Sequence, residues 1–128
     1  IVSWLAPLLK NTDIEIIEAH HNRKVDSPSG TAQMLADSIN DALDNKLHCE
    51  YNRHDKHEKR DKNEIGMSSI RGGNIVGEHS VQFIGNFETF EIKHTSYSRN
   101  VFAEGSLKAA EFIVNEQPGM YAMEDMFD

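Results

Sequence analysis

The hydrophobic periodicity of the chain changes several times, and the order of these changes limits the folds open to it. Asp13–His20 (DIEIIEAH) alternates as a strand does, whereas the apolar residues of 31–44 recur at helical spacing. Strand-like stretches follow at 65–71, 74–84 and 87–96, and a second helix is expected at 101–115. This order predicts an α+β fold, in which two main helices pack on a mixed, mostly antiparallel sheet.

Glycines and a polar run mark the expected connections between these elements. Gly72-Gly73 and Gly85-Asn86 stand where tight hairpin turns need a positive φ, and the second turn would place Val81 opposite Phe90. Residues 52–64 (NRHDKHEKRDKNE) contain no apolar side chain. We therefore expect this run to be an exposed loop or arm.

Composition and charge argue against several classes of protein. The 128 residues fit one domain, residues 1–128, and a formal net charge of -8 argues against non-specific binding to nucleic acid or to anionic membranes. The single cysteine, Cys49, cannot form an internal disulfide, which favours a reducing compartment and a cytoplasmic protein. The N-terminal IVSWLAPLL is too short to span a membrane. We expect residues 2–10 to be the end of a helix that packs through Trp4, Leu5, Leu8 and Leu9.

One stretch, EAHHNRKVDSPSGTA (residues 18–32), gathers groups that suit an anionic substrate. His20 and His21 can transfer protons near neutral pH, and Lys24 adds a mobile ammonium. Ser29-Gly30-Thr31 opens the expected helix, whose first N–H groups can hold a carboxylate or phosphate. The plainer interpretation is a helix cap beside two histidines without a role. Further along, Arg99 could clamp a carboxylate.

Other chemistries have weaker support. His54 and His57 have a spacing that could share a zinc ion, but their surroundings look solvated, and we expect no metal site. Cys49 lies in a short strand candidate, residues 47–51, and is expected to pack rather than to react. The glycines of RGGNIVGEH do not match the dinucleotide fingerprint GxGxxG. The sequence therefore holds no Rossmann cofactor motif.

The motifs EAHHNRKVDSPSGTA, RGGNIVGEHSVQF, FEIKHTSYSR and PGMYAMEDMFD together resemble dihydrodipicolinate reductase, also called 4-hydroxy-tetrahydrodipicolinate reductase. The resemblance covers nearly the whole chain from Asp13 onward. It implies the C-terminal, substrate-binding and tetramer-forming part of an NADH- or NADPH-dependent oxidoreductase of diaminopimelate and lysine biosynthesis. It also implies that the family's N-terminal Rossmann domain is absent here, and that residues 101–128 normally pack on it.

The resemblance also implies roles for single residues. His20 matches the family's catalytic acid/base and Lys24 its second proton donor. The residues that match substrate ligands are His21, Ser29, Gly30, Thr31 and Arg99. The substrate is a cyclic dicarboxylate, and the missing first half puts turnover by this chain alone in doubt. Two alternatives stay open: a non-catalytic assembly module that uses apolar strand faces around Val81, Phe83, Phe90 and Ile92, and a histidine metal-binding domain.

Overall fold

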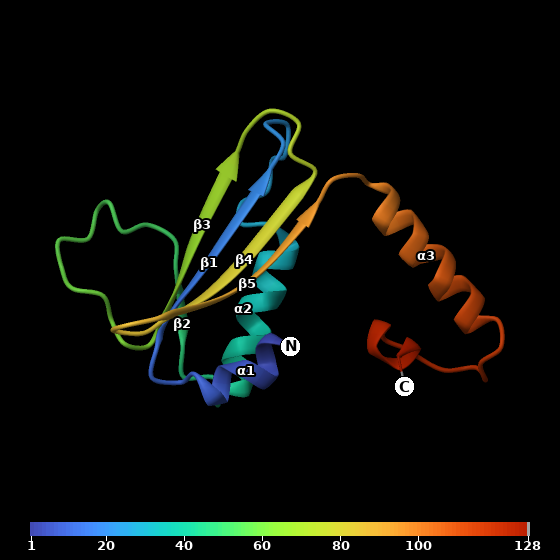
Figure 1. Ribbon diagram of the computed structural model, residues 1–128, viewed down its shortest axis with the longest axis horizontal. Coiled ribbons are helices and arrows are strands. Elements are labelled where there is room, and N and C mark those ends of the chain that lie inside the picture. The colour runs from blue at the N-terminus through green and yellow to red at the C-terminus, as the bar shows by residue number, and fades with distance from the viewer. Residues whose placement is uncertain (128) are drawn as a thin grey trace. The chain divides into compact units, whose positions relative to one another are not determined.

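The computed structural model describes residues 1–127 and divides the chain into two compact units, Ile1–Thr95 and Ser96–Asp128 (Figure 1). The first unit contains, in order, α1 (Val2–Leu8), β1 (Asp13–His20), α2 (Gly30–Ala42), β2 (His48–Glu50), β3 (Glu64–Arg71), β4 (Gly77–Ile84) and nearly all of β5 (Thr89–Ser96). The second contains α3 (Asn100–Ile113) and a 3-10 turn, η1 (Met123–Met126). The predicted α+β class is confirmed.

The five strands form one mixed sheet in the order β2-β3-β1-β4-β5. β1 and β2 each run parallel to β3, whereas β1 and β4 are antiparallel. A parallel neighbour cannot be reached by a tight turn. The polar run predicted as an exposed arm supplies the long connection from β2 to β3, and it swings out at the left of Figure 1, in green.

Both predicted glycine turns differ from the structure. β1 lies between β3 and β4, so Gly72-Gly73 does not close a hairpin between paired strands. Instead this loop bonds to the end of β1: the Gly72 N–H donates to the His20 carbonyl (2.9 Å). In the β4–β5 connection the Gly85 N–H donates to the Glu88 carbonyl (2.8 Å), which moves the turn to residues 86–87. The predicted pairing of Val81 with Phe90 is therefore wrong.

The core lies between one face of the sheet and the helices α1 and α2. Its buried side chains come from alternate positions of three strands and from the inner faces of the two helices: Val2, Ala6, Ile14, Ile16, Ala32, Ala36, Ile39, Ile65, Met67, Val81 and Phe83. The helical spacing predicted for α2 is thereby confirmed. Val81 and Phe83, which the sequence suggested for an assembly surface, are only 2% and 1% exposed in this core.

The first helix packs on a different face from the one predicted. Val2 and Ala6 are buried, and Leu5 and Leu9 are partly buried against the core. Trp4 and Leu8 remain exposed. The spacing explains the difference, because residues 2, 5, 6 and 9 share one helical face that meets α2.

The second unit presents an apolar helix. α3 ends two residues earlier than predicted and carries no buried residue, and exposed apolar side chains run along it, including Phe102 and Leu107. Phe112 meets Tyr121 edge to face, with ring centroids 5.7 Å apart. Within residues 1–127, no helix is long and apolar enough to cross a membrane.

Candidate active site

Residues 18–20 of the motif form the C-terminal end of β1, His21 follows the strand, and the SPSG turn leads into α2. His20 is the last residue of the strand, and Ser29 is the N-cap of the helix. The Ser29 Oγ accepts the Ala32 N–H (3.2 Å), which confirms the capping role. The strand end and the helix start are thus brought together at one edge of the sheet.

The structure adds a residue that we did not single out from the sequence, Glu18. Its side chain is 1% exposed, and its Oε2 lies 2.6 Å from the His20 Nδ1. Arg71 grips the same carboxylate with two bonds, Nη1 to Oε2 (2.8 Å) and Nη2 to Oε1 (2.7 Å). Burial raises the pKa of Glu18, but hydrogen bonds from Arg71, His20 and Ser69 outweigh it and lower the pKa to about 2.

His79 completes the cluster from the neighbouring strand β4. Its ring meets the ring of His20 edge to face, with centroids 5.1 Å apart, and its Nε2 shares a hydrogen bond with the Ser29 Oγ (2.8 Å). Burial lowers the pKa of His79, the nearby groups His20, His94 and Lys24 lower it further, and the negative charge of Glu18 opposes them. His79 is therefore favoured as a neutral ring beside His20.

Among the predicted substrate ligands, Ser29 already has hydrogen-bond partners within the fold, whereas Gly30 and Thr31 are accessible. Ser29 is buried, and its N–H donates to the Glu18 Oε1 (3.1 Å), so its backbone and hydroxyl already have partners. Gly30 and Thr31 are exposed at the first positions of α2. Their N–H groups precede the intrahelical hydrogen bonds and face no side-chain acceptor in residues 1–127.

The three cationic and imidazole candidates have different settings. The Lys24 Nζ donates to both carboxylate oxygens of Asp26, at 2.7 and 2.8 Å. The backbone N–H of Lys24 donates to the His21 carbonyl (3.1 Å). His21 is half-buried next to His20. Arg99 belongs to the second unit, where it is the N-cap residue of α3.

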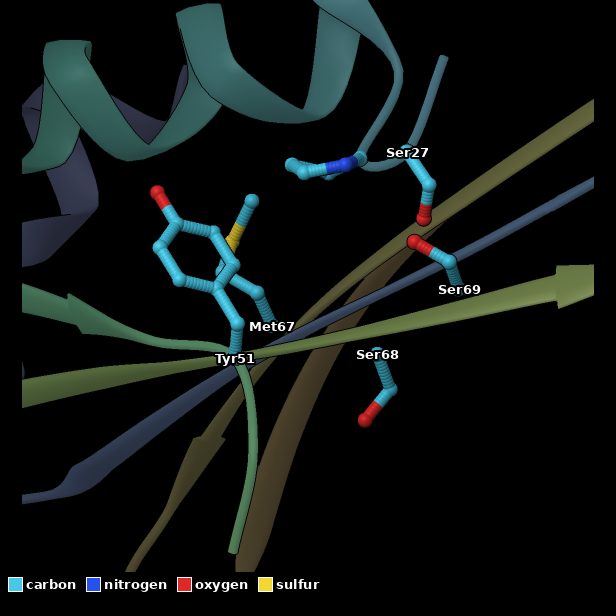
Figure 2. A pocket seen from close by; sticks show the side chains of 6 residues that line it. Ser27, Tyr51, Met67, Ser68 and Ser69 are labelled. Atoms are coloured by element: carbon cyan, nitrogen blue, oxygen red, sulfur yellow. The ribbon is translucent and has the colours of Figure 1, made fainter. Parts of the chain in front are cut away.

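A pocket of about 540 Å³ opens along β3, beside the motif (Figure 2). Figure 2 shows the hydroxyl groups of Ser27 and Ser69 turned toward each other, while Ser68 points to the other side of the strand. Tyr51 and Met67 line the end of the pocket that lies away from Ser27 and Ser69. The pocket lining includes none of the seven predicted site residues, but it includes Ser27 and Pro28 of the motif and Ser69, the cross-strand neighbour of Glu18.

Glu18 could have been recognised from its place in the strand. Ile14, Ile16 and Glu18 share one face of a strand with a two-residue period, and a charged residue on an apolar face needs a partner inside the fold. Its cross-strand neighbours, Ser69 and His79, come from 50 or more residues away. The sequence pattern offers nothing that sets this register.

The predicted zinc pair lies elsewhere. His54 and His57 are exposed in the β2–β3 connection. In the part of the chain that the structure describes, no group of three or more His, Cys, Asp or Glu side chains could hold a metal ion. Cys49 is a free thiol in β2 that packs against the core, as predicted.

Comparison with known proteins identifies the family. Residues 1–127 match the family model described as dihydrodipicolinate reductase, C-terminus. The chain belongs to the dihydrodipicolinate reductase family. It is 59% identical over 126 residues to the 4-hydroxy-tetrahydrodipicolinate reductase of Brachyspira hyodysenteriae, covering 98% of this chain and 54% of that protein. It is 51% identical over 126 residues to the reductase of the same name from Caldanaerobacter subterraneus, covering 98% and 50%.

A solved member of the dihydrodipicolinate reductase family has the same fold. The dipicolinate-bound dihydrodipicolinate reductase from Paenisporosarcina sp. TG-14 superposes with a TM-score of 0.62 at 26% identity. The match covers 83% of this chain and 42% of that one. The chain therefore spans about half the length of the curated relatives that it matches.

Proposed function

We propose that this chain is the substrate-binding half of a 4-hydroxy-tetrahydrodipicolinate reductase of lysine and diaminopimelate biosynthesis, working in the cytoplasm. One observation carries the proposal: His20 and Lys24 lie in the motif that runs from β1 to the open N–H groups of α2. The relatives' names and the dipicolinate-bound neighbour support a cyclic dicarboxylate as the ligand.

The side chains divide the work of binding and protonation. The N–H groups of Gly30 and Thr31 and the positive end of α2 would hold one carboxylate, since helix N-termini bind anions. Lys24 would exchange Asp26 for the substrate and offset negative charge as it develops. His20 would give a proton to the ring. His21 and Arg99 are further ligands in this proposal, whereas Ser29 would act through the helix cap.

The described residues do not fit a dinucleotide. The family consists of pyridine-nucleotide-dependent oxidoreductases, but the glycines of RGGNIVGEH fall in the β3–β4 loop and at the start of β4, with no helix after them in residues 71–84. NADH or NADPH would be held by a nucleotide-binding domain. Residues 101–128 would pack on that domain through the exposed apolar side chains of α3.

A homotetramer is part of the same proposal. The helices α1 and α2 cover one face of the sheet, and Ile17 and Ile70 lie on the other, where they line a pocket of about 110 Å³. Ile70 is 51% exposed. Ile70→Glu should convert a tetramer to a smaller species in light scattering, while Met34→Glu, on the exposed side of α2, should not. A wild-type monomer at micromolar concentration would contradict this assembly.

Calorimetry with pyridine-2,6-dicarboxylate tests the ligand. Lys24→Ala should weaken binding about tenfold or more, because it removes a charge-assisted contact. Thr31→Val should weaken it less, because it removes only the hydroxyl and keeps the backbone N–H that would hold the carboxylate. Lys46→Ala is the matched control, since Lys46 also pairs with an aspartate two residues away (Asp44, 2.9 Å) but lies beyond the other end of α2. Absence of binding to the folded wild-type chain, or unchanged affinity in Lys24→Ala, would overturn the proposal.

A further inference from the structure

Glu18 is a carboxylate on the sheet face that α2 covers. It shares that face with Ile14 and Ile16, and its side chain is 1% exposed. A charge in such a place is costly unless it is paired and hydrogen-bonded. Arg71 supplies a two-pronged ion pair and the Ser29 N–H a third bond. These contacts hold the carboxylate in place as an anion.

An ionised carboxylate can only accept hydrogen bonds. At 2.6 Å from the Glu18 Oε2, the His20 Nδ1 must therefore be the donor. A neutral imidazole carries one N–H, so the proton on Nδ1 leaves Nε2 as the nitrogen with a free lone pair. Nε2 faces Gly77, where an added Cβ would lie 3.4 Å away, so the absence of a side chain there leaves room beside it.

We propose that Glu18 is a positioning residue: anchored by Arg71, it keeps neutral His20 as the Nδ1–H tautomer and directs Nε2 to the substrate. Nε2 is then the nitrogen that takes up a proton from solvent and passes it to the substrate ring, which returns His20 to the Nδ1–H form. This inference rests on the proposed function for the chemistry at Nε2. A buried carboxylate that orients a histidine through Nδ1 is a general device for setting its tautomer. Glu18 itself would touch no substrate.

The other charged groups around His20 do not replace Glu18. The charged and titratable groups that act on Glu18 or on His79 come from β3, β5 and the loop after β1: Arg71, His94 and Lys24. Asp26 acts on Lys24 and Arg71. Asp26 is bonded to Lys24, and its backbone carbonyl accepts from Arg71 (2.7 Å). Glu18 is thus the carboxylate in this cluster that contacts the His20 ring.

Nitrogen-15 NMR of the histidine rings tests the proposal in the full chain. At a pH where His20 is neutral, the wild type should show one dominant tautomer, protonated at Nδ1 and bare at Nε2. Glu18→Gln should mix or reverse the two tautomers, and Glu18→Asp should restore the wild-type signature in part. A wild-type His20 protonated at Nε2 would overturn the inference even if Glu18→Gln failed to fold.

Kinetics separate positioning from a structural role. In the complete reductase polypeptide that carries this chain, Glu18→Gln should lower kcat by about 10²-fold, with a much smaller change in KM. Glu64→Gln is the matched control, because Glu64 is also a buried, arginine-bound glutamate but contacts no histidine ring in the described residues. Equal losses in the two variants would reduce Glu18 to a structural residue.

Failure of this inference is distinguishable from failure of the proposed function. If wild type does not bind pyridine-2,6-dicarboxylate, the substrate assignment is wrong, yet the tautomer of His20 can still be measured. If the ligand binds and Glu18→Gln keeps both the wild-type tautomer and kcat, the positioning role is wrong and the substrate assignment stands.

Discussion

Two buried glutamates, Glu18 and Glu64, lie near opposite ends of the parallel pair β1 and β3. Both are held by arginine: Glu18 by Arg71, and Glu64 by Arg60 (2.9 Å) and also by Arg53. They lie on opposite sheet faces, Glu18 under α2 and Glu64 under the β2–β3 connection. Only the Glu18 carboxylate also contacts a histidine ring in the described residues.

The difference shows what a buried ion pair can be used for. At Glu64 the arginines come from the polar connection itself, and Arg60 also bonds to the Ile14 carbonyl (2.7 Å), so the pair fastens that loop to the sheet. At Glu18 the arginine leaves one side of the carboxylate to His20. The same residue types therefore fasten a loop at one end and orient an imidazole at the other.

Removing the arginine from each pair should give the largest effect. Arg71→Met and Arg60→Met each leave a buried carboxylate without its main partner, which we expect to lower the free energy of unfolding by about 3–5 kcal/mol. Urea unfolding measures both. In the complete reductase polypeptide, turnover per folded molecule should fall only in Arg71→Met. An equal fall in Arg60→Met would contradict the difference between the two ion pairs.

Lowering the pH should remove the contribution of ionised Glu18 to the free energy of unfolding over a defined pH window. The pKa of Glu18 falls from 4.5 to about 2 on folding, so its contribution is complete above pH 4.5 and is lost as the pH falls toward 2. The stability difference between wild type and Glu18→Gln should shrink by about 3 kcal/mol across this window. The deficit of Ile39→Ala, a core variant with no titrating group, should stay constant. A pH-independent difference for Glu18→Gln would refute the assignment.

The helix cap should contribute less than either ion pair. Ser29→Ala removes the bonds from Oγ to Ala32 and His79 but keeps the backbone N–H that donates to Glu18. We expect a loss of about 1 kcal/mol in urea unfolding, with the His20 tautomer unchanged. A tautomer change in this variant would show that Glu18 depends on the cap as well as on Arg71.

The smallest effect on stability is expected for Arg53, the more exposed arginine partner of Glu64. The Arg53 side chain is 43% exposed, and its ion pairs with Glu15 and Glu64 are partly screened by water. Arg53→Ala should lower the free energy of unfolding by less than about 1 kcal/mol and leave the affinity for pyridine-2,6-dicarboxylate unchanged. A loss as large as that of Arg60→Met would mean that Arg53 is the main anchor of Glu64.

Much of the fold follows from local patterns. The period of two in β1, the helical spacing of α2 and the Ser29 cap were each predictable, because they depend on neighbours in sequence. The hairpin at Gly72-Gly73 was predicted wrongly because glycine permits a turn but does not select which strands pair. That loop instead spans the end of β1, and its backbone bonds to His20.

The sequence by itself determined the family motif, the placement of His20 and Lys24 between a strand and a helix, and the apolar faces that build the core. Only the tertiary structure decided that Glu18 and Arg71 stand behind His20 and that His79 lies beside it. The physical reason is the strand order: β1 lies between β3 and β4, which brings Arg71 and His79 to it from distant parts of the chain.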